Sequence, residues 1–209
     1  MKRQFIFLYV LFSTIIYLHE VYPGEDALTC QRDTSFEYFL SLFEGSGKSI
    51  SVELAQQFLS GIEEIRVYND FHNAGGSPEM DITLITAGIA GKVEHYIALF
   101  VELSEMEPGH IYESTFFITF TYSGEMIDYI EFASGASGDY YSTETNGQLV
   151  NDSTIYKEYI EYVSDLEYTE EGMPPEFVTD IDTLGIELYY VRQDGIIELT
   201  EDEIFYESE

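Results

Sequence analysis

Asp128 invites a chemical interpretation because it is a lone carboxylate within a run of aromatic and branched residues. The surrounding stretch FITFTYSGEMIDYIEF, residues 117–132, holds two such runs on either side of Ser123-Gly124. A shielded carboxylate can act as a general acid or base. A two-residue turn at Ser123-Gly124, however, places Thr119 opposite Asp128 on neighbouring strands. It also places Phe120 opposite Ile127 on one face of the hairpin and Thr121 opposite Met126 on the other. We therefore predict that Asp128 is a cross-strand hydrogen-bond partner of Thr119, and that Asp128→Asn costs little stability.

Gly47-Lys48-Ser49 ends like a phosphate-binding P-loop. That motif needs a glycine five positions before its Gly-Lys pair, where this chain has Leu42, and it must follow a strand. The preceding residues have helical spacing instead. The segment is therefore predicted to be a loop between helices, in which Ser49 or Ser51 caps the next helix.

Asp180 and Asp182, followed by Gly185, begin like a calcium-binding loop. The fifth and twelfth positions of such a loop must supply oxygen ligands, but they are Leu184 and Val191 here. This excludes a dedicated calcium loop of the helix–loop–helix type.

The other residue types that commonly carry catalysis lack the spacing that catalysis requires. The four histidines show no metal-binding pairs: His19, His72, His95 and His110. No nucleophile elbow of the form GxSxG is present, and no pair is singled out among the 40 acidic residues. The sequence thus predicts no catalytic, cofactor-binding or metal-binding residue and favours a protein that is not an enzyme. A hydrolase that uses surface carboxylates is kept as an alternative.

Two short helices are expected near the beginning of the globular part. Asp33-Thr34 with Glu37 has the form of a capping box. The apolar residues of the first helix then follow at i, i+3, i+4 and i+7: Phe36, Phe39, Leu40 and Phe43. A second helix is expected from about Ser51, ending near Ser60-Gly61 or one turn later.

From residue 95 onward the hydrophobic period changes from helical to two. The stretch HYIALFVEL, residues 95–103, is apolar on both sides, which indicates a central strand. We expect turns at Ser123-Gly124, at Asn146-Gly147 and at Gln193-Asp194-Gly195. The last of these pairs Val191 with Ile197 and Tyr189 with Leu199. The predicted fold class is α+β, with two short N-terminal helices packed on a mainly antiparallel β-meander sheet.

The charge of the chain limits its partners. Its 40 acidic and 8 basic residues give a formal charge of −32. Nucleic acid is excluded because binding it needs Lys and Arg to displace counterions from phosphate, and an anionic membrane surface would repel the chain. The expected partner is an unknown protein, and the charge is compatible with a basic protein or a cation, or with a role of the charge in solubility alone. Membrane contact is expected only through the N-terminal segment or a lipid anchor.

The first residues are typical of an export signal. Lys2 and Arg3 precede an apolar run from Phe5 to Leu18, which is short for a membrane span and suits a signal peptide. Ala27-Leu28-Thr29-Cys30 resembles a degenerate bacterial lipobox, so Cys30 is a candidate for lipidation. We predict a signal peptide or N-terminal anchor over residues 1–29 and a single α+β domain with an acidic C-terminal tail over residues 30–209.

One broader resemblance covers most of residues 34–200. A leader, a Phe-rich helix, the hairpin TYSGEMIDYIEF and the later hairpin YYVRQDGIIEL together resemble uncharacterised secreted proteins and lipoproteins of Bacteroidetes. The resemblance implies an exported α+β protein and transfers no catalytic residue. The expected function is a non-enzymatic binding or cell-envelope-associated protein, located in the periplasm or at the outer-membrane surface. The alternative is an immunity or inhibitor protein that neutralises a basic toxin or enzyme.

Overall fold

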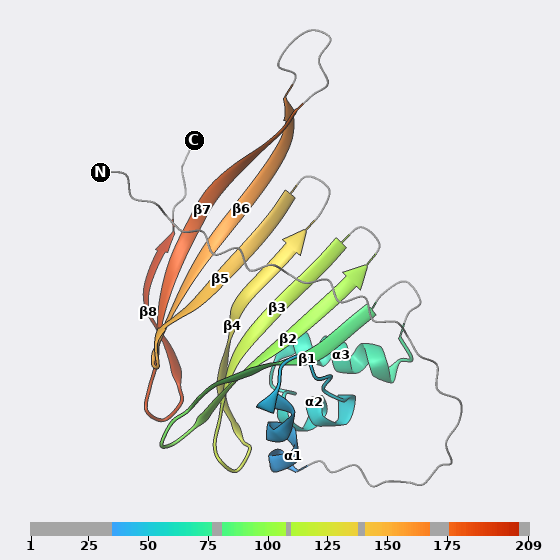
Figure 1. The fold of residues 1–209 in the computed structure, drawn as a ribbon, viewed down its shortest axis with the longest axis vertical. Helices are drawn as coiled ribbons and strands as arrows, with labels where there is room; N and C mark the ends of the chain where they lie inside the picture. The colour runs from blue at the N-terminus through green and yellow to red at the C-terminus, as the bar shows by residue number, and fades with distance from the viewer. Residues whose placement is uncertain (1–34, 77–80, 108–109, 138–140, 168–175, 205–209) are drawn as a thin grey trace. The chain divides into compact units, whose positions relative to one another are not determined.

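The computed structural model describes residues 35–76, 81–107, 110–137, 141–167 and 176–204. The leader 1–29, Cys30, the Asp33-Thr34 pair and residues 205–209 of the tail lie outside these ranges. Three short helices come first (Figure 1): α1 Phe36–Ser41, α2 Val52–Phe58 and α3 Glu63–Asn73. A single 3₁₀ turn, Leu42–Glu44, follows α1.

Eight strands then form one antiparallel sheet in which every strand pairs with the next in the chain. Their bounds are β1 Asp81–Lys92, β2 Ile97–Glu107, β3 His110–Phe120, β4 Met126–Ser137, β5 Tyr141–Asn151, β6 Thr154–Glu167, β7 Glu176–Val191 and β8 Ile197–Ile204. The predicted order of helices followed by an antiparallel meander is confirmed.

The predicted number of helices is wrong, because α3 was not anticipated. α1 and α2 both start at a serine cap: the hydroxyl oxygens of Ser35 and Ser51 accept hydrogen bonds from backbone N–H groups in the first turns. The predicted capping box at Asp33-Thr34 is therefore wrong, because Ser35 is the N-cap of α1. The residue that precedes α3 is Ile62, which makes no side-chain cap. The sequence therefore gives no side-chain signal for the start of α3, and Gly61 indicates the end of the preceding helix instead.

Two hydrophobic clusters lie on the two faces of the sheet. In the first, the helices pack on β1–β4, with Phe39 and Phe58 stacked at a centroid distance of 4.8 Å. In the second, residues of β2–β4 pack against Ile155 of β6 and Val191 of β7. β2 contributes Leu99 to the first cluster and Ala98 to the second, as expected for a central strand. Each fully buried aliphatic or aromatic side chain contributes about 1.5–3 kcal/mol.

The segment that resembled a P-loop covers the outer edge of β1. Gly47 and Ile50 donate backbone hydrogen bonds to the carbonyl oxygens of Thr86 and Leu84, at 2.6 and 2.9 Å, and Thr86 N donates to Lys48 O at 2.9 Å. Of the two candidate caps, Ser51 caps α2. The segment is therefore a loop between helices, as predicted, and it pairs with the sheet.

The β3–β4 hairpin confirms part of the predicted register. Thr119 lies opposite Asp128, Ile118 opposite Tyr129 and Phe117 opposite Ile130. The predicted pairing of Phe120 with Ile127 is wrong, because Phe120 lies opposite Met126 and Ile127 is a bulge. The bulge sends Met126 to the helix side of the sheet and Ile127 to the second cluster, which reverses the predicted faces of both side chains.

The later turns give one confirmation and one correction. The β7–β8 hairpin pairs Val191 with Ile197 and Tyr189 with Leu199, as predicted, with Gly195 at φ +88°. The predicted turn at Asn146-Gly147 is wrong: both residues lie within β5, opposite Glu158 and Lys157 of β6.

Candidate functional site

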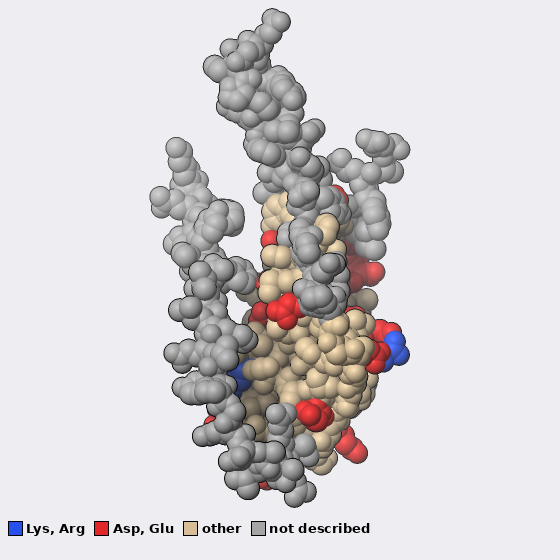
Figure 2. All heavy atoms as spheres, turned by 90° about the vertical axis from the view of Figure 1, so that its right-hand side faces the viewer, with Lys and Arg blue, Asp and Glu red and all other residues tan. Residues whose placement is uncertain are grey.

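The basic side chains of the described residues are largely held by acids of the same chain. Arg66 contacts Glu63, Lys157 contacts Glu187 at 3.6 Å, and Arg192 contacts two carboxylates at 2.7 Å each. Asp and Glu are spread over the face of the molecule that Figure 2 shows, and Lys and Arg are sparse there. Most of the negative charge is therefore not balanced within the chain, which favours a cationic partner.

Four turns gather at one end of the sheet, because every second connection of an antiparallel meander returns to the same end. They are residues 93–96, 121–125, 152–153 and 192–196, which join β1 to β2, β3 to β4, β5 to β6 and β7 to β8. We call this region the turn end. Turns held by a rigid sheet are frequent places for binding residues.

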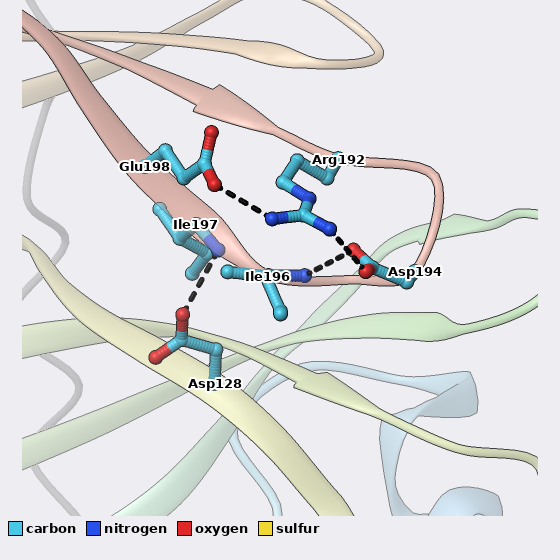
Figure 3. A network of polar contacts seen from close by, with 6 residues as sticks. All are labelled: Asp128, Arg192, Asp194, Ile196, Ile197 and Glu198. Atoms are coloured by element: carbon cyan, nitrogen blue, oxygen red, sulfur yellow. Dashed lines mark hydrogen bonds and ion pairs between the residues drawn. The ribbon is translucent and has the colours of Figure 1, made fainter.

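Asp128 joins two of these hairpins, although they are far apart in the sequence. Its Oδ2 accepts a 2.9 Å hydrogen bond from the backbone N–H of Ile197 at the start of β8 (Figure 3). Its Oδ1 accepts a 2.9 Å bond from the N–H of Tyr129. Asp128 is a cross-strand hydrogen-bond partner of Thr119, as predicted, but through its backbone: the Thr119 hydroxyl donates to the carbonyl oxygen of Asp128 at 3.2 Å. The same hydroxyl lies closer to the carbonyl oxygen of Gly195, at 2.7 Å, while the Asp128 carboxylate binds elsewhere.

Further hydrogen bonds fix the other turns. The Tyr122 hydroxyl donates to the carbonyl oxygen of Val93 at 2.7 Å, and the N–H of Val191 donates to Ser153 O at 2.7 Å. Gly195 lies so close to β4 and to the β1–β2 turn that an added Cβ would lie 2.8 Å from Ile127 Cδ1 and 3.3 Å from Tyr96 Cβ. The turn end is thus one connected surface, with few independent motions expected.

Replacing Asp128 with Asn should lower the free energy of unfolding by about 2 kcal/mol, which revises the small cost expected from the sequence. The amide has a single oxygen, so one of the two N–H groups would lose a charged acceptor and face an NH₂ group. Urea unfolding of wild type and variant measures the difference. Asp81→Asn, at an exposed position of β1, is the matched control and should change it by less than about 0.5 kcal/mol. An equal effect of both variants would contradict this role of Asp128.

Two hollows open at the turn end. The first, of about 320 Å³, lies between the β1–β2 and β5–β6 hairpins and is lined by Lys92, Tyr96, Phe117, Leu149, Asn151 and Asp152 among others. The second, of about 680 Å³ and more open, is lined by His95, Thr121, Ile127, Tyr190, Arg192 and Asp194 among others. Apolar walls with a few polar groups are common in binding sites of this size.

A buried lysine lies farther along the second half of the sheet. Lys157 has a side chain only 5% exposed, and its Nζ donates to the hydroxyl of Tyr159 at 3.0 Å. Tyr159 and Tyr189 both donate to Glu187 Oε2, at 2.5 and 2.7 Å. The Nζ also lies 5.1 and 5.6 Å from the centres of the two tyrosine rings. The sequence carried one sign of this cluster, since Lys157 stands at an inward position of β6 between Ile155 and Tyr159.

Burial and hydrogen bonding together shift the pKa values of Lys157 and Glu187 in this cluster. Burial lowers the pKa of Lys157, and the negative charges of Glu187 and Glu131 partly offset that effect. Burial acts to raise the pKa of Glu187, but hydrogen bonds from Tyr159 and Tyr189 and the charge of Lys157 lower it overall. The cluster is an ion pair with satisfied hydrogen bonds, and neither hollow is lined by it.

The pKa of the Glu102 carboxyl group is raised, mainly by burial and secondly by the negative charge of Glu113. A raised pKa suits a general acid. Glu113 lines a separate hollow of about 190 Å³ that Glu102 does not line. Among the hollows formed by the described residues, the pair therefore does not share one.

The remaining candidates from the sequence are not brought together. His72 contacts the carbonyl oxygen of Ile82, His95 lies in the β1–β2 turn and His110 begins β3. Asp180 and Asp182 belong to β7, and their side chains, like His19 and Cys30, lie outside the described parts. Within the described ranges, no group of three or more His, Cys, Asp or Glu residues could hold a metal ion.

Comparison with protein-family models, with curated proteins and with solved structures gave no match to this chain. None of the helices in the described part is both long enough and apolar enough to span a membrane. The resemblance to Bacteroidetes proteins stays a prediction.

Proposed function

We propose that this chain is an exported, non-enzymatic binding protein of the cell envelope, which holds a basic protein partner at the turn end. Residues 1–29 would direct export, and Cys30 would carry a lipid. The observation that carries the proposal is the unbalanced negative charge of a surface whose few described cations are mostly paired internally. Such a surface speeds association with a cationic partner and discourages anionic ones.

The construction of the turn end supports its assignment as the contact surface. Four turns are held together by hydrogen bonds to side chains and backbone, so little conformational entropy would be lost when a partner docks. The two hollows offer space for protruding side chains of the partner. Tyr190, which lines the second hollow, is 43% exposed and can supply apolar contact area.

A photo-crosslinking amino acid in place of Tyr190, in the native cell, tests the proposal. We expect adducts with a basic protein, lost when cells are opened in about 0.5 M salt before irradiation, because screening then acts within a few ångströms. The same amino acid at Val67, which is 47% exposed on α3, is the control and should give no such adduct. Mass spectrometry of the recovered protein should show a new N-terminus near residue 30.

Three outcomes would contradict the proposal. Equal adducts from both positions, or an acidic partner, would remove the turn end as a site for a basic protein. An intact Met1 in the soluble cytosol would refute export. The narrower form, an inhibitor of a basic toxin or enzyme, predicts in addition that the captured partner loses its activity when this chain is added at low salt.

A further inference from the structure

The two edge strands of the sheet, β1 and β8, differ in what covers them. The outer edge of β1 is covered by the segment Gly47–Ile50 through three backbone hydrogen bonds. β8 is the last strand of the sheet, and no strand in the described ranges pairs with its outer side. An uncovered edge leaves N–H and C=O groups available to an incoming strand.

The register shows which backbone groups of β8 point outward. Ile197 lies opposite Val191, yet the N–H of Ile197 donates to Asp128 of β4 and the N–H of Val191 donates to Ser153 of the β5–β6 turn. Ile197 and Val191 are therefore a pair without mutual hydrogen bonds, and by alternation the pair Leu199 and Tyr189 is another. The N–H and C=O of Leu199 thus point away from β7, towards the outer edge of the sheet. The Leu199 side chain is 49% exposed.

The side chains along this edge are strongly acidic. Residues 198–203 are all exposed. Glu198 is paired with Arg192, whereas no described basic side chain lies within ion-pair distance of Glu201, Asp202 or Glu203. This edge would repel a second copy of itself, because two such strands side by side would bring like charges into contact.

We propose that the outer edge of β8, from Leu199 onward, accepts an extended segment of another protein that carries lysine or arginine, as one further strand of the sheet. Backbone hydrogen bonds would supply the strand geometry, and the three free carboxylates would select a basic sequence. This surface follows the turn end along β8 but is distinct from it, so the inference goes beyond the proposed function.

Leu199→Pro tests the backbone part of the proposal. Proline removes an outward N–H while leaving the hydrogen bonds to β7 intact, so the fold should persist. Leu199→Ser, which keeps the N–H, is the matched control. The probe is a synthetic peptide of about ten residues that alternates lysine with valine, and its dissociation constant is measured by calorimetry with the full chain. We expect the proline variant to bind at least about tenfold more weakly than wild type, and the serine variant within about twofold.

Two further measurements test the charge and the strand conformation. Glu201→Gln/Glu203→Gln should weaken binding about tenfold at low salt, and the difference should shrink at about 0.5 M salt. A peptide of equal charge with proline in place of every valine should not bind. Equal binding by the proline and serine variants, equal binding of both peptides or no binding of the alternating peptide would each overturn the proposal. So would a wild-type dimer, seen by sedimentation, that Leu199→Pro abolishes. Crosslinking at Tyr190 does not depend on the outer edge of β8. Failure of the strand-binding proposal can therefore be distinguished from failure of the proposed function.

Discussion

Replacing Glu187 with Gln should lower the free energy of unfolding by about 3 to 4 kcal/mol, because it removes one partner of a largely buried ion pair. Lys157, 5% exposed, would keep its positive charge without a counter-charge at 3.6 Å. Tyr159 and Tyr189 would donate to a neutral amide oxygen where they now donate to a carboxylate, and hydrogen bonds to neutral groups are weaker. Urea unfolding at about pH 7 measures the change.

A double-mutant cycle separates the charge from the packing. Lys157→Met keeps an unbranched side chain of similar length and removes the charge that needs Glu187. The double variant Lys157→Met/Glu187→Gln should therefore recover about 2 kcal/mol or more of the loss caused by Glu187→Gln alone. Additive effects of the two substitutions would show that Lys157 and Glu187 do not stabilise each other.

The pH dependence gives a second, independent check. The pKa of Glu187 is lowered from 4.5 in the folded chain, so its contribution is present above 4.5 and is lost as the pH falls through the lower, folded value. Wild type should lose this stability in acid, and the Gln variant should not. The pKa of Lys157 is lowered from 10.5, so stability rises with pH between its folded value and 10.5. Removing Glu187 lowers that pKa further, so the stability defect of the variant should shrink as the pH is raised from neutral towards 10.5.

The parts of the fold that could be predicted are those set by local chemistry. Ser51 before an apolar helical stretch, Gly195 after Asp194 and the alternation from Ile97 to Leu103 each act within a few residues. The start of α3 could not be predicted, because Ile62 offers no side-chain oxygen to the first helical N–H groups. The bulge at Ile127 could not be predicted either. A bulge adds one residue to a strand without changing the kinds of amino acid that the strand contains, so the sequence of the strand does not show it.

The candidate site depends on contacts that sequence spacing does not encode. Asp128 could be singled out because a carboxylate is unusual in that stretch, but its partner Ile197 is 69 residues away. The sequence presents the two hairpins as similar units, and the structure brings them together through Asp128 and Thr119. Which turns meet is decided by the curl of the whole sheet around the second hydrophobic cluster, a property of all eight strands.

Gly147→Ala should destabilise the protein by about 3 kcal/mol, although alanine usually stabilises a strand relative to glycine. A Cβ at residue 147 would lie 2.1 Å from the carbonyl oxygen of Phe132 and 2.8 Å from its ring. Phe132 is left unpaired with β3 by a bulge in β4, and the backbone oxygen can move away only if one of the strands moves. Gly135→Ala is the matched control, because nothing lies within 4 Å of its added Cβ, and it should be neutral or stabilising by up to about 1 kcal/mol. Urea unfolding of both variants decides the point: equal stabilities would mean that Gly147 is not required by the approach of β4, and a large difference would explain why an Asn-Gly pair occurs within a strand.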